Sequence, residues 1–278
     1  MKFKAFPKAL LFLTIVWLFD FLLRKGFLGF LLPLPLPSSY ATLVYFSLFA
    51  LAAWMTTRWF CRSDKSSLHE LGISLDRMNR KDFFIGFWIG LVIWAIVSVA
   101  QAGLAGFSWE LRPEISLFNI LYGLLFIFIA DLGTELFTRG YALTKFKDSV
   151  GAMLAIWIMT FFVGLKSYSP NLSGELLFYT MIIPALHTVF FSIIYFKTKR
   201  LGASLGIHTG ANFVTISLFD LRQEQSGQVI PSGVFQPSAD LETLPLTALQ
   251  LPWVLAAIIF SCIVYIWWKK SEKNEIRT

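Results

Sequence analysis

The sequence has few of the side chains that bind metals or form covalent cross-links. Only two cysteines and three histidines occur in 278 residues, and charged residues make up 15% of the chain, against about 25% in a soluble domain. Cys61 and Cys262 lie far apart, without the spacing of a disulfide framework or a zinc site. The chain also lacks a GxxxxGK[ST] loop and an HExxH pair. We therefore expect no cofactor.

Hydrophobic residues are abundant, at 56% of the chain, and they gather in blocks. A helix of about 20 apolar residues is long enough to cross a bilayer. Eight such blocks occur, at residues 9–32, 39–60, 83–106, 116–138, 149–168, 175–196, 201–219 and 249–268. We therefore expect an all-α fold: a polytopic membrane helical bundle of about eight transmembrane helices.

The net charge of +7 would suggest nucleic acid in a soluble protein, but here its distribution favours a membrane topology. If the N-terminus is cytoplasmic, the pieces on that side hold 19 of the 24 Lys and Arg residues. These pieces are the N-terminus, 58–82, 139–148, 197–200 and the C-terminal tail, and such an excess is typical of cytoplasmic loops. We expect a multi-pass cell-membrane protein, in a prokaryotic plasma membrane, with both termini cytoplasmic. Its partner is the lipid bilayer, with no nucleic acid.

Three charged residues stand late in the fourth block, in the stretch "ADLGTELFTRG". Asp131, Glu135 and Arg139 are spaced at i, i+4 and i+8, so they share one face of a helix. Ionisable groups inside a membrane are costly and persist mainly where they find partners or carry out a function. A structural Glu135–Arg139 ion pair is one interpretation, and a catalytic carboxylate is the other.

A second polar cluster lies on the seventh block, in "LGASLGIHTGANFV". His208 and Asn212 are four residues apart, and the small residues Gly206 and Gly210 allow a neighbouring helix or a substrate to approach closely. Imidazole and amide N–H groups are donors that can stabilise a developing oxyanion. Glu135 could then act as the base toward a water molecule.

These motifs together resemble those of the CPBP family of intramembrane proteases, which includes CAAX prenyl endopeptidases, bacteriocin-processing (Abi-type) proteins and lysostaphin-resistance proteins. The family pattern is EExxxR, then FxxxH, then HxxxN or HxxxD on successive helices. Here "TELFTRG", "FVGLK" and "HTGAN" take these positions in order. The resemblance covers about residues 116–219. It implies an endopeptidase that cuts a membrane-associated peptide or protein.

The sequence departs from that pattern at two positions. Thr134 replaces the first glutamate, and Lys166 replaces the histidine of the second motif, four residues after Phe162. In the family these two residues are taken to activate the attacking water, while the last motif stabilises the oxyanion. The resemblance thus places Thr134, Glu135, Arg139, Lys166, His208 and Asn212 in the catalytic site, with the water-activating side altered.

Several functions remain open at this stage. We expect a CPBP-type endopeptidase, with Glu135 as base, or a pseudoprotease scaffold in which Glu135 and Lys166 form a structural ion pair. A transporter relay through Asp131, Glu135 and Lys166 is a third hypothesis. A zinc site made by Glu135, His187 and His208 is a fourth, although its ligands would come from three helices.

The chain is expected to divide into three parts. Residues 1–115 hold N-terminal transmembrane helices and a cytoplasmic loop at 61–82. Residues 116–219 form the CPBP-like core that carries the motifs. Residues 220–278 hold an outer loop, the last transmembrane helix and a basic tail.

Overall fold

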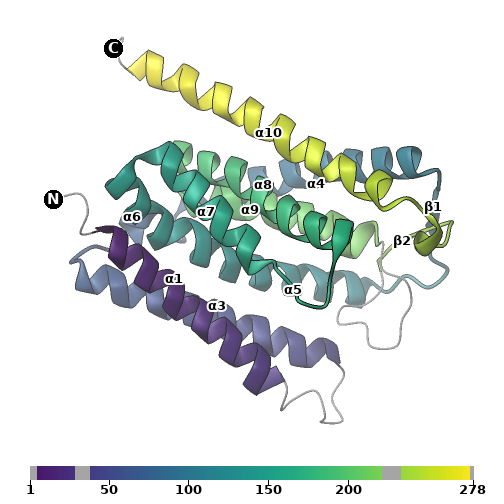
Figure 1. Ribbon diagram of the computed structural model, residues 1–278, viewed down its shortest axis with the longest axis horizontal. Helices are drawn as coiled ribbons and strands as arrows, with labels where there is room; N and C mark the ends of the chain where they lie inside the picture. The colour runs from purple at the N-terminus through teal and green to yellow at the C-terminus, as the bar shows by residue number, and fades with distance from the viewer. Residues whose placement is uncertain (1–4, 29–37, 221–232, 276–278) are drawn as a thin grey trace.

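The computed structural model describes residues 5–28, 38–220 and 233–275, and it is a bundle of helices with one short strand pair (Figure 1). The α-helices are α1 (Ala5–Leu22), α3 (Ser38–Ser63), α4 (Arg77–Ala105), α5 (Leu117–Glu135), α6 (Tyr141–Val150), α7 (Ala152–Lys166), α8 (Gly174–Thr198), α9 (Leu201–Asn212) and α10 (Leu246–Glu275). The π-helical turns are η2 (Leu23–Leu28), η4 (Leu136–Gly140) and η5 (Phe213–Leu218), and the 3₁₀ turns are η3 (His69–Leu71) and η6 (Leu241–Thr243). The all-α expectation is confirmed.

Six helical segments among the described residues are long and apolar enough to cross a membrane. They are Ala5–Gly26, Tyr40–Ser63, Arg77–Ala105, Leu117–Val150, Gly174–Thr198 and Leu246–Lys270. The other two expected spans are helical but short: α7 has 15 residues and α9 has 12. A 15-residue helix is about 22 Å long, less than the roughly 30 Å of a bilayer core. The chain is thus a multi-pass membrane protein, and its topology stays a prediction.

The segment 139–148 differs from the expectation of a cytoplasmic loop. It continues from α5 through η4 into α6, where Arg139, Tyr141 and Phe146 are buried. The expectation of a cytoplasmic loop depended only on basic residues, since Arg139, Lys145 and Lys147 fall within nine residues and such clusters are typical of cytoplasmic loops. Burial of its apolar face against α1 and α7 holds it inside the bundle instead.

Helices α4 and α9 run parallel and make the most extensive contact between helices in the described structure. Gly202, Gly206 and Gly210 of α9 lie directly against backbone carbonyl oxygens of α4, at Asn79, Phe83 and Phe87 in turn. A side chain at any of these glycines would collide with that backbone. The regular spacing of small residues therefore brings the two helices together and fixes the depth of His208 and Asn212.

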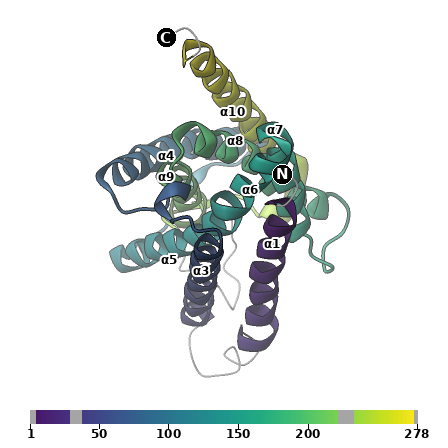
Figure 2. The same ribbon diagram turned by 90° about the vertical axis from the view of Figure 1, so that its left-hand side faces the viewer.

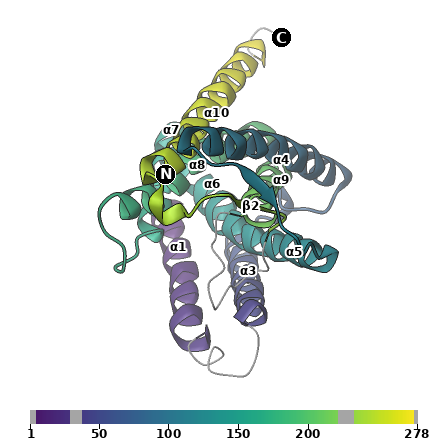
Figure 3. The ribbon, with the colours of Figure 1, turned by 90° about the vertical axis from the view of Figure 1, so that its right-hand side faces the viewer.

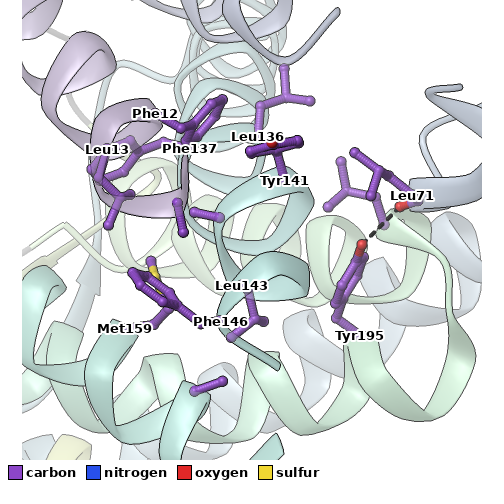
Figure 4. Close-up of a cluster of buried hydrophobic side chains, with 14 of the residues drawn as sticks. Phe12, Leu13, Leu71, Leu136, Phe137, Tyr141, Leu143, Phe146, Met159 and Tyr195 are labelled. Atoms are coloured by element: carbon purple, nitrogen blue, oxygen red, sulfur yellow. Dashed lines mark hydrogen bonds between the residues drawn. The ribbon is translucent and has the colours of Figure 1, made fainter. Parts of the chain in front are cut away.

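The remaining helices surround this pair. Helix α10 crosses the top of the bundle in Figure 1 and packs on α8 and α4, while α1 and α3 form a pair on the opposite side. Figure 2 shows α1 and α3 side by side beneath α6 and α5. The largest hydrophobic cluster lies between α1, α3, α6, α7 and α8, with Phe12, Leu136, Tyr141, Phe146 and Met159 among its members (Figure 4).

The two ends of the bundle differ. Both chain ends lie at one end in Figure 1, and a two-stranded antiparallel ribbon lies at the other. The ribbon pairs β1 (Trp109–Leu111) with β2 (Phe235–Pro237), as Figure 3 shows from the right-hand side. The ribbon connects the end of the expected N-terminal part, residues 1–115, to the expected outer loop that begins at residue 220. Residues 221–232 of this loop lie outside the described residues. Three-residue strands give no extended hydrophobic signal, which is why the sequence did not predict them.

Candidate active site

Glu135 forms the centre of a buried polar cluster at the end of α5. Its side chain is fully buried, and both of its oxygens accept hydrogen bonds from Arg139. One of these bonds joins Arg139 Nε to Glu135 Oε2 at 2.8 Å. The backbone between the two residues widens into the π turn η4, a distortion found often at functional sites. The ion pair expected from the i, i+4 spacing is confirmed.

His208 of α9 lies between two carboxylates of α5. Its Nδ1 is 2.9 Å from Glu135 Oε1, and its Nε2 is 3.5 Å from Asp131 Oδ1. Carboxylate oxygens can only accept hydrogen bonds when ionised, so a doubly protonated imidazole satisfies both neighbours. With Arg139 included, the cluster then has two positive and two negative groups. This balance explains how Asp131, Glu135 and Arg139 remain buried beside the partly exposed His208.

Asn212 and Asp131 extend the cluster by one helical turn. Asn212 Nδ2 donates a hydrogen bond of 2.7 Å to Asp131 Oδ1. The other carboxylate oxygen, Asp131 Oδ2, is buried and has no hydrogen bond of standard geometry among the described residues; neither has the hydroxyl of Thr209. The Thr209 side chain nonetheless interacts with the Asp131 carboxylate, at a geometry poorer than that of a standard hydrogen bond. Asp131 is therefore less firmly bonded than Glu135, whose two oxygens both accept from Arg139.

Phe191 of α8 closes the cluster from the side. The Arg139 guanidinium lies 4.8 Å from the centre of the Phe191 ring, and the His208 ring lies 4.9 Å from it. The aromatic face contributes a cation–π contact and excludes lipid and water from the charges. This contact could not be predicted from the sequence, because nothing distinguishes Phe191 from the other 28 phenylalanines.

Thr134, expected in the site, does not contribute its hydroxyl to the cluster. Thr134 Oγ1 donates a hydrogen bond of 3.1 Å to the carbonyl oxygen of Ala130 on its own helix. Hydroxyl groups in helices commonly bond in this way to the carbonyl one turn back. Thr134 is next to Glu135 in the chain but about 100° around the helix from it.

Lys166 is placed differently from the expectation. Instead of pairing with Glu135, its Nζ lies 3.8 Å from Asp20 Oδ2 of α1. The same ammonium lies over the rings of Phe49 and Phe137, at 4.6 and 5.0 Å from their centres. Asp20 also accepts from the Tyr45 hydroxyl and pairs with Arg24, which lies 3.3 Å away.

The expected Glu135–Lys166 ion pair is therefore wrong. Lys166 ends α7 and belongs to a second polar cluster, which joins α7 to α1 and α3. The transporter relay through Asp131, Glu135 and Lys166 needs Lys166 next to Glu135, and this pairing is not formed. Lys166 pairs with Asp20 instead of Glu135. Asp20 lies 146 positions earlier in the chain, and nothing in a single sequence indicates that two residues so far apart are in contact.

His187 lies on α8 among aromatic rings. Its Nδ1 is 2.6 Å from the carbonyl oxygen of Ile183, which can only accept, so this nitrogen is the donor. The imidazole packs against Trp94 and Phe190, with ring centres 5.5 Å away in both cases. Within residues 5–28, 38–220 and 233–275, no group of three or more His, Cys, Asp or Glu side chains is placed to hold a metal ion. The alternative hypothesis of a zinc site made by Glu135, His187 and His208 is therefore not supported by these residues.

Comparison with known proteins identifies the segment that contains this cluster. The family model described as type II CAAX prenyl endopeptidase, Rce1-like, matches residues 116–214. This range covers Asp131, Glu135, Arg139, His208 and Asn212, and it confirms the family resemblance found in the motifs. No curated protein and no solved structure matches the chain.

Proposed function

Because residues 116–214 form a domain of the Rce1-like CPBP family, we propose that the protein is an intramembrane endopeptidase that hydrolyses a peptide bond of a membrane-associated peptide or protein. The observation that carries the proposal is the position of His208 between Asp131 and Glu135 in a charge-balanced cluster, in which both carboxylates are buried and 19% of the His208 side chain is exposed. Such a cluster can supply a general base and hydrogen-bond donors for a developing oxyanion, with His208 as its exposed edge.

The proposed base is Asp131 rather than Glu135. Both oxygens of Glu135 are occupied by Arg139, and one of them also accepts from His208. Asp131 lies four residues earlier on the same face of α5, and its Oδ2 has no hydrogen bond of standard geometry, although the Thr209 side chain interacts with this carboxylate. A water molecule bonded to this oxygen can lose a proton to it as the water oxygen attacks the peptide carbonyl carbon. The carbon–nitrogen bond then breaks, and Asp131 returns the proton to the leaving amine.

His208 and Asn212 are the proposed donors to the oxyanion. Asn212 Nδ2 has a second N–H group beyond the one that it donates to Asp131. His208 Nε2 makes only a long contact of 3.5 Å with Asp131 Oδ1, and the developing oxyanion would replace this contact. In this proposal Glu135 and Arg139 do not touch the reacting atoms. They hold the His208 ring by its Nδ1 atom, and a fixed orientation of donors is what makes an oxyanion site effective.

A second candidate is a pseudoprotease that binds membrane partners without cutting them. Two observations favour it. Thr134 takes the place of the first motif glutamate and bonds only to its own helix, and Lys166, at the position of the second-motif histidine, is held by Asp20. Both residues that the family uses to activate water are therefore absent from the cluster.

The two functions can be separated by looking for new peptide N-termini in membranes of cells that express the chain. Quantitative mass spectrometry would compare wild type, His208→Ala, Asp131→Asn and the control Thr134→Ala at equal amounts of folded protein. An endopeptidase gives products with wild type and Thr134→Ala that are lost with the other two variants. Membranes with no wild-type-dependent products would favour the pseudoprotease.

A further inference from the structure

A cavity of about 530 Å³ opens at the end of the bundle where α4 and α9 begin. Its wall contains Arg77, Lys199 and Arg200, and the one carboxylate in its lining is that of Asp76. This is the end that the charge pattern predicts to be cytoplasmic. The lining residue Arg200 precedes His208 by eight residues along α9, and none of Asp131, Glu135, Arg139, His208 and Asn212 lines the cavity.

The floor of the cavity is a rigid contact between the segment before α4 and the turn between α8 and α9. Gly72 lies directly against the backbone of Lys199 and Arg200. Asn79 is buried and ties the two segments together: its Nδ2 donates to the carbonyl oxygen of Gly72 at 2.7 Å, and its Oδ1 accepts from the backbone N–H of Gly202 at 2.6 Å. The cationic side chains therefore project from a fixed backbone.

The charges of the lining are not balanced within it. Asp76 is committed to capping α4, where its two oxygens accept from the backbone N–H of Asn79 and from the Ser74 hydroxyl. Arg200 pairs with Asp82 of α4 at 2.5 Å. Arg77 and Lys199 are exposed. The cavity thus has an excess of positive charge, and an anion is the complementary ligand.

Apolar side chains around the cavity indicate what kind of anion fits. Leu75, beside the cavity, is 88% exposed, and Met78, in its lining, is 49% exposed. Met78 lies on the same face of α4 as Ile85, Ile89 and Val92, at helical spacing, with the exposed Lys81 between Met78 and Ile85. The exposed apolar face therefore begins one turn beyond this lysine, at Ile85, and continues along a helix long enough to span a membrane. A free phosphate ion has no apolar part that could contact this face of α4.

We propose that this cavity binds the headgroup of an anionic phospholipid, with its phosphate between Arg77 and Lys199 and its acyl chains along the exposed face of α4. Basic pockets between membrane helices on the cytoplasmic side are typical sites for acidic lipid headgroups. The volume is large enough for a glycerophosphate group. The lipid fills the gap between the loop before α4 and the α8–α9 turn, next to the N-terminal end of the helix that carries His208.

Native mass spectrometry of the purified chain in detergent tests the proposal, with dioleoyl phosphatidylglycerol and dioleoyl phosphatidylcholine as probes. The wild type should bind the anionic lipid at least tenfold more tightly than the zwitterionic one. The double variant R77Q/K199Q should lose roughly tenfold or more of this affinity, because each cation near the headgroup contributes to binding. The matched control K65Q/R80Q also removes one exposed lysine and one exposed arginine, neither of which lines the cavity, and it should retain the preference.

A second comparison separates a lipid from a free phosphate ligand. The variant L75S/M78S should weaken binding of the anionic lipid, while glycerol 3-phosphate should bind no variant tightly. Equal affinity for the two lipids, or an equal loss of affinity in K65Q/R80Q, would overturn the site. Tight binding of glycerol 3-phosphate that R77Q/K199Q abolishes would overturn the lipid assignment. Thermal unfolding of each variant checks that it is folded.

Discussion

Asp131 and Glu135 are both carboxylic acids one helical turn apart, yet their surroundings leave them with different hydrogen-bond partners. Glu135 is fully bonded to Arg139 and His208, while Asp131 keeps one buried oxygen without a standard hydrogen bond. The spacing of charges in the sequence predicted that they share a face. It could not predict which carboxylate would be less firmly bonded, because that depends on how α9 is placed against α5.

The Glu135–Arg139 pair should be essential for folding. Arg139→Gln leaves Glu135 buried with a single cationic neighbour, and removing one partner of a buried ion pair typically costs about 3–5 kcal/mol. Chemical unfolding in detergent micelles would measure the loss. The double variant E135Q/R139Q should be less destabilised than the sum of the two single variants. A loss below about 1 kcal/mol for Arg139→Gln would contradict the buried pairing.

Asp64 should make the free energy of unfolding depend on pH in the acid range. Burial opposes its charged form, but hydrogen bonds from Lys145, Lys8 and Tyr141 outweigh this effect and lower the pKa of Asp64 from 3.8 to about 2. A lowered pKa means that this stabilisation is present above about pH 4 and is lost as the pH falls toward 2. Thermal unfolding between pH 2 and 5 should show this slope in wild type and a smaller slope in Asp64→Asn. Equal slopes would show that the carboxylate is unperturbed.

At the scale of helices, the active site depends on close packing of α9 against α4. The sequence identified Gly206 and Gly210 as small residues beside the polar pair, and it suggested that a helix or a substrate approaches them. The structure shows that α4 is the neighbour. Which helix fills a small-residue groove cannot be derived from one sequence, since every span offers a comparable apolar face.

Gly206→Ala should therefore destabilise the protein. The added methyl group would collide with the Phe83 carbonyl oxygen and force α9 away from α4. The matched control is Gly103→Ala near the end of α4, where a side chain meets nothing within 4 Å. In that helix alanine is favoured over glycine by about 0.5–1 kcal/mol. Thermal unfolding should rank Gly103→Ala at or above wild type and Gly206→Ala well below it; the opposite order would contradict the packing.

The Asp20–Lys166 contact should act as a link between α1 and α7. Asp20→Asn leaves the half-buried Lys166 ammonium without its carboxylate, and we expect a loss of up to about 3 kcal/mol in the free energy of unfolding. Adding Lys166→Met removes the unpaired charge and should recover part of the loss. Unfolding of the single and double variants in the same detergent measures the coupling. Strictly additive losses would show that the two residues do not interact.

For the whole molecule, composition and block length were sufficient to predict an all-α membrane bundle, because a bilayer imposes both helix length and apolar content. Six long helices confirm the multi-pass character. The apolar blocks at 149–168 and 201–219 predict full spans, but the helices α7 and α9 within them are shorter. The blocks are longer because apolar residues flank the helices, such as those of the π turn η5. The motifs on α5 and α9 predicted a shared site, whereas Lys166 was misplaced because its partner lies on the distant α1.

The measurement that tests the account most directly is peptide turnover by the purified chain in lipid nanodiscs. A membrane peptide that the wild type cuts would be incubated with wild type and with Asp131→Asn, matched for folded protein by thermal unfolding. The account predicts cleavage by the wild type and loss of at least about 99% of the rate in the variant, in line with removal of a general base. Cleavage by Asp131→Asn at the wild-type rate would contradict it.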